Sequence, residues 1–362
     1  MIFIDITEEC NLNCKHCYVK HNKGILSINY LKKFIEYLIH QKLIQKEDEI
    51  CFIGGEPFLY KSHLKKCIKL ISKLLPKTQI SVFSNLSFNY EEIKDILNLS
   101  KIKIYTSLDG TEFSHNNIRR LKDGNSYELV YQNLKKLSKI KDQIEVVYTF
   151  DPNFEKQDFI KFIDEILTIN KDPEKWLINL RPAFPNANFN NSNWYLNEIE
   201  KLTKYWISNL KKGIIVNISL ISGALKILNE ENKVQPCGIG DTLFVLKPNG
   251  DIWPCNQYYR INQRKIGNIS KNSFKEIEKE RIKLKLFKNI LYEKYPKKKC
   301  DCFLFQSCRG IPCPASYEEN NFECNEHEKV VAKIIEMITY ILQKNFTKEE
   351  LKKINLKENN FE

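Results

Sequence analysis

The sequence predicts an α/β protein in which a parallel sheet with covering helices is followed by a small cysteine-rich unit. Two observations lead to this prediction. Over residues 1–213, six short β-rich runs alternate with five longer amphipathic runs. Over residues 237–324, seven of the twelve cysteines gather around a hairpin pattern. Alternating strands and helices are typical of a parallel sheet, whereas clustered thiols are typical of a metal-organised domain.

The six predicted strands are short and rich in β-branched and aromatic residues. They cover residues 2–6, 49–53, 79–84, 102–107, 144–150 and 176–181, and the helices between them lie near residues 29–45, 61–75, 90–99, 126–141 and 155–169. The first helix has Leu31, Phe34, Ile35 and Leu38 on one face. Periodicity alone leaves two arrangements open, a partial barrel and an open doubly wound sheet. In both, ligands bind at the carboxyl ends of the strands.

The second half of the chain no longer shows the regular alternation of strands and helices. Residues 196–232 look helical and lead to the hairpin TLFVLKPNGDIWPC, in which Asn249-Gly250 is a strong two-residue turn signal. Residues 326–345 form an amphipathic closing pattern. We therefore expect four parts: a core over residues 1–213, a helical bridge over residues 214–236, a cysteine-rich domain over residues 237–330, and a C-terminal helix and tail over residues 331–362.

Composition narrows the class of protein. With 42% apolar residues the chain can build a core, and it contains no run of about 18 apolar residues and no signal-peptide pattern at MIFIDITEEC. We therefore expect a cytoplasmic protein with no membrane partner, whose thiols bind metal rather than form disulfides. The net charge of +12 suggests an acidic partner, such as nucleic acid, an acidic peptide or an electron-transfer protein. A coding bias toward Lys, Ile and Asn would explain much of the same charge.

Three cysteines follow the first predicted strand at once, in the spacing Cys10-x3-Cys14-x2-Cys17. Three thiolates on a cluster of four irons leave one iron open for a chelating ligand, whereas four thiolates close the site. A zinc loop completed by His16 or His21 is the alternative. Closed zinc sites usually show two short cysteine pairs, which this loop lacks.

Polar and glycine-containing segments follow three more predicted strands. They are Gly54-Gly55-Glu56-Pro57, Asn85, and Ser107-Leu108-Asp109-Gly110 with His115 and Arg119 downstream. Together with the cysteine loop and Tyr18 directly after it, this order resembles the radical S-adenosylmethionine (SAM) superfamily, whose core is a partial (β/α)6 barrel. The resemblance implies that the open iron binds SAM and that the glycine segment and Glu56 hold its amino group. It also implies that Ser107 and Asp109 contact the ribose, that Arg119 pairs with the carboxylate, and that Asn85 occupies the place of an asparagine typical of the family.

The second cysteine set has the spacing Cys237-x12-Gly250-x4-Cys255, Cys300-x-Cys302-x5-Cys308-x4-Cys313, then Cys324. It resembles the SPASM extension of radical SAM enzymes, which carries two auxiliary [4Fe-4S] clusters. By position, Cys237, Cys255 and Cys313 would bind the first and Cys300, Cys302, Cys308 and Cys324 the second. One residue separates Cys300 from Cys302, where two are usual, and four separate Cys308 from Cys313, where three are usual. These differences weaken the assignment of individual cysteines to the two clusters. A zinc ribbon, or one cluster with spare thiols, is the alternative. The two remaining thiols, Cys51 and Cys67, are expected to be small buried hydrophobes.

The resemblance implies a reaction type. A reduced cluster cleaves SAM to a 5′-deoxyadenosyl radical, which abstracts hydrogen from the substrate. We therefore expect three [4Fe-4S] clusters, SAM, and a flavodoxin or ferredoxin-type electron donor. The sequence shows no convincing acid and base pair, so no catalytic side chain is assigned. Since no leader-binding domain precedes the first strand, recognition would fall to the cysteine-rich region, the basic surface or a separate leader-binding protein.

Enzymes with both patterns mostly act on peptides. We expect an oxidoreductase that installs a thioether or carbon-carbon crosslink in a ribosomally synthesised peptide. Peptide epimerisation and sulfatase maturation are alternatives, but sulfatase-maturing enzymes have an Asp after the cysteine of the Gx4C segment, where this chain has Asn256. The charge leaves an RNA-modifying radical enzyme open, although we do not expect a nucleic-acid partner, and a non-catalytic metal-binding scaffold is the remaining class.

Several aromatic residues and one arginine are candidates for the substrate cleft. The aromatic candidates are Trp194, Tyr195, Tyr258, Tyr259 and Phe303, although aromatic residues in such patterns more often pack in a core. Arg181, at the end of the sixth predicted strand, is expected at the same mouth.

Overall fold

The computed structural model describes residues 1–44, 48–99, 102–140, 144–151, 154, 157–170, 172–183, 194–229, 237–294, 313–319 and 326–358. All six predicted strands are present, as β1 (Ile2–Thr7), β3 (Glu49–Gly54), β4 (Gln79–Ser84), β5 (Ile102–Ser107), β7 (Ile144–Phe150) and β8 (Trp176–Pro182). Each pairs in parallel with the next in that order.

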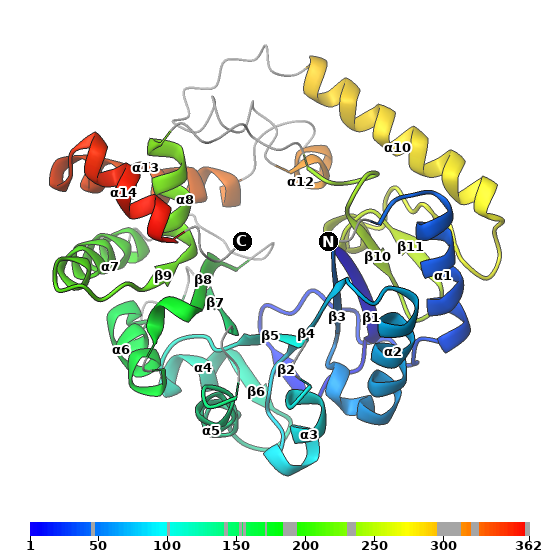
Figure 1. Ribbon diagram of the computed structural model, residues 1–362, viewed down its shortest axis with the longest axis horizontal. Coiled ribbons are helices and arrows are strands. Elements are labelled where there is room, and N and C mark those ends of the chain that lie inside the picture. The colour runs from blue at the N-terminus through cyan, green and yellow to red at the C-terminus, as the bar shows by residue number, and fades with distance from the viewer. Residues whose placement is uncertain are drawn as a thin grey trace.

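The sheet curves into a partial barrel, which settles the choice that periodicity left open. Figure 1 shows the strands around an inner space, with the helices on the outside and the ring incomplete on one side. The outer helices are α1 (Ile28–His40), α2 (Lys61–Leu74), α3 (Tyr90–Leu97), α5 (Tyr127–Leu137), α6 (Phe159–Ile169) and α7 (Trp194–Lys211). Their apolar faces bury the even-numbered residues of β1, such as Ile2, Ile4 and Ile6.

Helix α1 shows how local sequence sets these elements. The Ser27 side chain accepts a hydrogen bond from the amide of Asn29 and caps the first turn. Leu31, Phe34 and Leu38 are fully buried on one face. The helix ends at His40, earlier than the predicted residue 45, and Lys42 has a positive φ of 55°. This left-handed conformation is incompatible with a continuing α-helix.

Several short elements between the barrel strands were not predicted from the sequence. The loop after β1 contains β2 (Leu12–Cys14), which pairs antiparallel with β6 (Arg119–Leu121) so that Cys14 lies opposite Arg119. The short helix α4 (Glu112–Ile118) precedes β6, and 3-10 turns occupy Pro57–Tyr60 and Pro173–Lys175. Three-residue strands and single-turn helices are too short to produce a periodic pattern.

The predicted hairpin is confirmed and extends the barrel sheet. Strands β10 (Phe244–Leu246) and β11 (Asp251–Trp253) flank the turn, in which Gly250 has a φ of 85°. Strand β10 lies parallel to β1, with Ile2 opposite Phe244. A two-residue strand, β12 (Gly267–Asn268), completes this edge. The cysteine-rich region is therefore joined to the barrel core by backbone hydrogen bonds.

The predicted bridge is only partly helical. Strand β9 (Asn217–Ile218) pairs with β8 before α8 (Ser219–Leu228) begins, and residues 230–236 lie outside the described part. The later helices are α9 (Asn256–Arg260), the unpredicted α10 (Phe274–Lys294), α12 (Pro314–Glu319), α13 (Glu326–Asn345) and α14 (Lys348–Glu358). Helix α13 agrees with the predicted closing helix. In the described residues, no helix is long and apolar enough to cross a membrane.

A buried ionic cluster connects the hairpin to the strand that precedes the first cysteine loop. The Lys247 ammonium on the β10 side pairs with the carboxylates of Asp5 and Glu8, the latter at 2.9 Å. The Tyr259 hydroxyl donates to Glu8, and its ring lies 3.6 Å beneath the Lys247 nitrogen. All four side chains are at least nine-tenths buried. Removing one charge would leave an uncompensated buried partner, so this cluster fixes the hairpin against β1.

Candidate functional site

A cavity of about 800 Å³ lies inside the partial barrel, where the strands end. Ten of the predicted site residues line it: Cys10, Cys14, Cys17, Tyr18, Gly54, Gly55, Asn85, Ser107, Arg119 and Cys313. They come from the loop after β1, from the ends of β3, β4 and β5, from β6, and from the start of α12. The cavity therefore joins the first cysteine loop to part of the cysteine-rich region.

The sulfurs of the first loop receive hydrogen bonds from other strand ends. The Asn85 amide nitrogen lies 3.7 Å from Cys10 Sγ, and Arg119 Nη1 lies 3.8 Å from Cys14 Sγ. Burial, together with the nearby Glu56, Cys14 and Cys17, raises the pKa of Cys10 to about 12. Three such thiols close together become thiolates when a metal centre binds them. A three-thiol loop with open cavity space beside it suits an iron-sulfur cluster with one free iron.

Among the described residues, the histidines near this loop do not join the cysteines in a group placed to hold a single metal ion. His21 Nε2 lies 3.4 Å from Cys17 Sγ. His16 lines the cavity, with Nε2 3.7 Å from Asp109 Oδ2, and burial lowers its pKa to about 4. The sequence had suggested His16 only as a zinc ligand, and its position between two cysteines was the signal for a cavity role.

The two glycines of the Gly54-Gly55-Glu56-Pro57 segment allow it to lie against the first loop. A Cβ on Gly54, whose φ is 141°, would lie 2.0 Å from the carbonyl oxygen of Thr7, and one on Gly55 would lie 2.2 Å from that of Glu9. The amides of Gly55 and Glu56 donate to the same carbonyls, at 2.7 and 2.8 Å. Close backbone packing within the chain therefore requires both glycines, in addition to any contact with a cofactor.

Glu56 is fully buried behind this segment, and neither it nor Pro57 lines the cavity. Its carboxylate accepts hydrogen bonds from the Phe58 amide at 2.9 Å, the Ser84 hydroxyl at 2.9 Å and the Asn85 amide at 2.7 Å. Burial raises the pKa of Glu56 to about 7, although these three donors lower it. In the structure Glu56 joins the ends of β3 and β4, and its contact with a cofactor amino group stays a prediction.

Asp109 and Arg119 form a buried ion pair beside the first loop. Arg119 Nε donates to Asp109 Oδ2 at 2.6 Å, and the Thr149 amide donates to Oδ1 at 2.9 Å. Burial raises the pKa of Asp109, but Arg119, His16 and His115 together outweigh burial and keep that pKa below its usual value. Asp109 therefore orients Arg119 toward Cys14, while Ser107 is the hydroxyl on the cavity wall. The ribose contact predicted for Asp109 is untested.

His115 connects the backbone of Asp109 to that of Arg119 through hydrogen bonds. The Asp109 amide donates to His115 Nδ1 at 3.0 Å, and His115 Nε2 lies 3.0 Å from the Ser126 hydroxyl, which donates to the Arg119 carbonyl. Since Nδ1 accepts, the proton of the neutral ring is assigned to Nε2. Burial lowers the pKa of His115 to about 3. His115 is thus a structural link between residues 109 and 119.

The aromatic residues predicted to line a cleft are packed elsewhere. Tyr195, Tyr258 and Tyr259 are buried, and Trp194 packs against the core through Tyr195, with 6.3 Å between ring centroids. The cleft prediction is therefore wrong for these four, since apolar rings bury more surface in the core. Phe303 lies outside the described residues. In contrast, Arg181 and Asn256 line the cavity.

Three of the seven cysteines in the second set are described, and they lie near one another. Burial, together with the nearby Cys313 and Cys237, raises the pKa of Cys255 to about 12. Cys255 caps α9, where its sulfur accepts from the Tyr258 amide at 3.5 Å. The remaining four, Cys300, Cys302, Cys308 and Cys324, lie outside the described residues. The buried positions predicted for Cys51 and Cys67 are confirmed.

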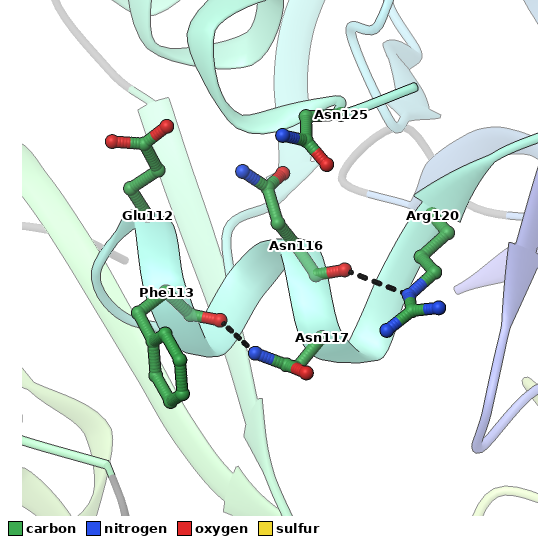
Figure 2. A pocket seen from close by; sticks show the side chains of 6 residues that line it. All are labelled: Glu112, Phe113, Asn116, Asn117, Arg120 and Asn125. Atoms are coloured by element: carbon green, nitrogen blue, oxygen red, sulfur yellow. Dashed lines mark hydrogen bonds between the residues drawn. The ribbon is translucent and has the colours of Figure 1, made fainter. Parts of the chain in front are cut away.

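A second hollow, of about 390 Å³, lies over α4 and β6 and contains none of the predicted site residues. Figure 2 shows Arg120 and Asn117 turned toward the backbone of α4. Arg120 Nε donates to the Asn116 carbonyl at 3.3 Å, and Asn117 donates to the Phe113 carbonyl at 2.7 Å. Arg119 and its neighbour Arg120 therefore have opposite surroundings, one in the cavity and one on this outer hollow.

Two family models match the chain. Residues 4–166 match the radical SAM superfamily, and residues 237–309 match the SPASM iron-sulfur cluster-binding domain. The sporulation killing factor maturation protein SkfB of Bacillus subtilis is 29% identical over 150 residues, which are 41% of this chain and 35% of SkfB. The radical SAM cyclopropyl synthase TigE of Paramaledivibacter caminithermalis is 26% identical over 236 residues, 58% of this chain and 47% of TigE. The matches thus span less than half of either relative.

Solved structures share the fold. Histidine-tagged anSMEcpe with bound AdoMet superposes with a TM-score of 0.71 at 18% identity, covering 96% of this chain and 98% of that one. SuiB of Streptococcus suis bound to its precursor peptide SuiA gives 0.61 at 13% identity, covering 88% and 72%. The partial barrel and the thiols that line its cavity are what the two matched family models lead one to expect. The chain therefore contains a radical SAM domain over residues 4–166 and a SPASM iron-sulfur cluster-binding domain over residues 237–309.

Proposed function

We propose that this protein uses SAM and three [4Fe-4S] clusters to modify a ribosomally synthesised peptide. One observation carries the proposal: a single cavity is lined by Cys10, Cys14 and Cys17 and also by Cys313 and Asn256. A substrate in this cavity would lie between a radical-generating site and the SPASM region. Such a shared space is what hydrogen abstraction followed by electron removal requires.

The residues of the first site would bind the cluster and the cofactor. Cys10, Cys14 and Cys17 would supply three ligands to a cluster that, when bound, would provide the electron for reductive cleavage of SAM. Arg119 presents its remaining guanidinium hydrogens to the cavity, where a methionyl carboxylate would pair with them. The backbone of Gly54 and Gly55 and the Ser107 hydroxyl line the same space. The enclosing barrel limits water near the radical.

The auxiliary clusters are assigned by spacing. Cys237, Cys255 and Cys313 would hold the first, and their mutual electrostatic influence supports one shared site. Cys300, Cys302, Cys308 and Cys324 would hold the second. A flavodoxin or ferredoxin-type partner would donate electrons to the enzyme. A cytoplasmic location forms part of the proposal, because reducing compartments keep thiols available for iron.

The relatives favour a peptide substrate. SkfB is named as a maturation protein and TigE as a cyclopropyl synthase, SuiB was solved with a precursor peptide, and anSMEcpe with the Cp18Cys peptide. We infer crosslink formation, thioether or carbon-carbon, as the reaction. Asn256 lines the cavity where sulfatase-maturing enzymes have an acid, and an amide cannot take a proton there. Epimerisation of a peptide residue is the second candidate, and a separate leader-binding protein would assist either reaction.

The test uses anaerobically reconstituted full-length protein. We expect about twelve irons per chain from three four-iron clusters, and 5′-deoxyadenosine formation after addition of dithionite and SAM. Co-expression with short peptides encoded beside its gene, followed by mass spectrometry, should then show a loss of two hydrogens for each crosslink. Absence of 5′-deoxyadenosine at full iron content would refute the radical function. Salt-sensitive tRNA binding with tRNA modification would instead favour an RNA substrate.

A further inference from the structure

Arg181 places a positive charge in the cavity wall, and no carboxylate of the described residues lies within ion-pair distance of it. It lies near the end of β8, where the alternation of the strand turns Asn179 and Arg181 to the inside. Its recorded hydrogen bond is a long one, 3.5 Å from Nε to the Thr149 hydroxyl. No ion pair of Arg181 occurs among the residues that the structure describes.

The acidic groups nearest to Arg181 are already engaged. Both oxygens of Asp109 are occupied, by Arg119 at 2.6 Å and by the Thr149 amide at 2.9 Å. Glu145, deeper in the barrel, accepts from the Asn179 side chain at 2.7 Å, and burial raises its pKa. Arg181 itself is exposed, and Asp109 and Glu145 act on it only from beyond ion-pair distance.

A guanidinium held in a cavity wall without a counter-ion favours an anionic ligand. Its planar donors match a carboxylate, and the pair gains strength where water is partly excluded. Arg119 is the cation at the first cluster loop, since it contacts Cys14. Arg181 enters from β8, on the far side of β7 from the strand β5 that leads to Asp109. The cavity thus presents one arginine beside the cluster loop and a second on another wall.

We propose that Arg181 binds the side-chain carboxylate of a Glu or Asp in the substrate peptide and so orients the neighbouring reactive residue. This inference rests on the proposed function, because it assumes that a peptide enters this cavity. It gives the substrate class a specific feature, an acidic residue close to the modification site. Arg181 would be a binding residue that sets specificity rather than a group that takes part in the radical step.

The experiment measures binding to reconstituted protein saturated with SAM, without reductant. The probes are the capped tripeptide acetyl-Gly-Glu-Gly-amide, its Gln isostere, and acetyl-Gly-Gln-Gly with a free terminal carboxylate, followed by saturation-transfer NMR. We expect the Glu probe to bind about tenfold more tightly than the Gln probe, as one charge-assisted pair would give. In Arg181→Gln the ratio should fall to about one, and Arg181→Lys should retain part of it. The control Arg120→Gln lies on the outer hollow and should keep the wild-type ratio.

Three results would overturn the proposal. The first is a Glu to Gln ratio near one in the wild-type protein. The second is equal binding of the peptide with the free terminal carboxylate, which would move the assignment to a chain end. The third is a weakened SAM affinity in Arg181→Gln with an unchanged ratio, which would assign Arg181 to the cofactor. Failure of the wild-type protein to form 5′-deoxyadenosine, with the ratio intact, would refute the proposed function and leave the carboxylate site standing.

Discussion

The two groups of thiols around the cavity are held in different ways. Cys10 and Cys14 accept hydrogen bonds from Asn85 and Arg119, which come from strands far along the chain. Cys255 accepts from the Tyr258 amide three residues away, at the start of its own helix. Cys10 also accepts from the Leu12 amide at 3.4 Å, so the first group combines local with tertiary contacts, whereas this contact of Cys255 is local. Function at the first loop should therefore be sensitive to distant residues.

The largest expected effect comes from removing one thiol of each group. Cys14→Ala should lower the iron content by about four per chain and reduce 5′-deoxyadenosine formation more than about 100-fold, because a two-thiol loop cannot hold the cluster. Cys255→Ala should remove a similar amount of iron but reduce cofactor cleavage far less. Iron analysis and chromatography of the nucleoside measure both. Equal loss of cleavage in the two variants would contradict the separation of roles.

The next effect concerns the tertiary support of the first loop. Arg119→Met removes the partner of buried Asp109 and the donor to Cys14, so we expect SAM affinity to fall about 10- to 100-fold. Arg120→Met, one residue along and on the outer hollow, is the matched control. Equilibrium binding of SAM to the reconstituted proteins measures the difference. Similar affinities in the two variants would show that Arg119 does not act on the cofactor site.

A third pair of variants tests the packing of the glycine segment against the loop. Gly54 and Gly124 both have positive φ values, 141° and 106°, but only at Gly54 would a Cβ meet backbone, at 2.0 Å. Gly124→Ala should cost about 1–2 kcal/mol of unfolding free energy from strain alone, and Gly54→Ala about 3 kcal/mol or more. Urea unfolding of the two proteins gives both values. Equal costs would mean that the loop moves aside easily.

The smallest effect at any one pH step is expected from the pH dependence of stability that His115 contributes. Its pKa is lowered from 6.5 to about 3, so on acidification the unfolded chain binds a proton that the folded chain does not. Stability should therefore fall with decreasing pH between about 6.5 and 3, and His115 should contribute about 1 kcal/mol per pH unit. His115→Asn should reduce this slope, whereas the same change at exposed His40 should not. Parallel slopes in wild type and His115→Asn would contradict the buried neutral ring.

The sequence was sufficient for those features that have a local signature. Strand and helix periodicity predicted the six barrel strands, and cysteine spacing predicted the loop that faces the cavity. Side-chain partners across strands have no such signature. The carboxylates of Glu56 and Asp109 bind amides 29 and 40 residues away, so their engagement within the chain was not visible. The pairing of β2 with β6 was not predicted either, because strands of three residues are too short to show a periodic pattern.

The parallel pairing of β10 with β1 also determines where the chain can be shortened without exposing the edge of the sheet. A barrel core cut at residue 213 would leave the backbone of Ile2, Phe3 and Ile4 unpaired along an apolar edge, and would leave Asp5 and Glu8 without Lys247. Exposed apolar edges recruit strands from other molecules. Such a fragment should aggregate, and a minimal version of the enzyme should keep the hairpin through Tyr259.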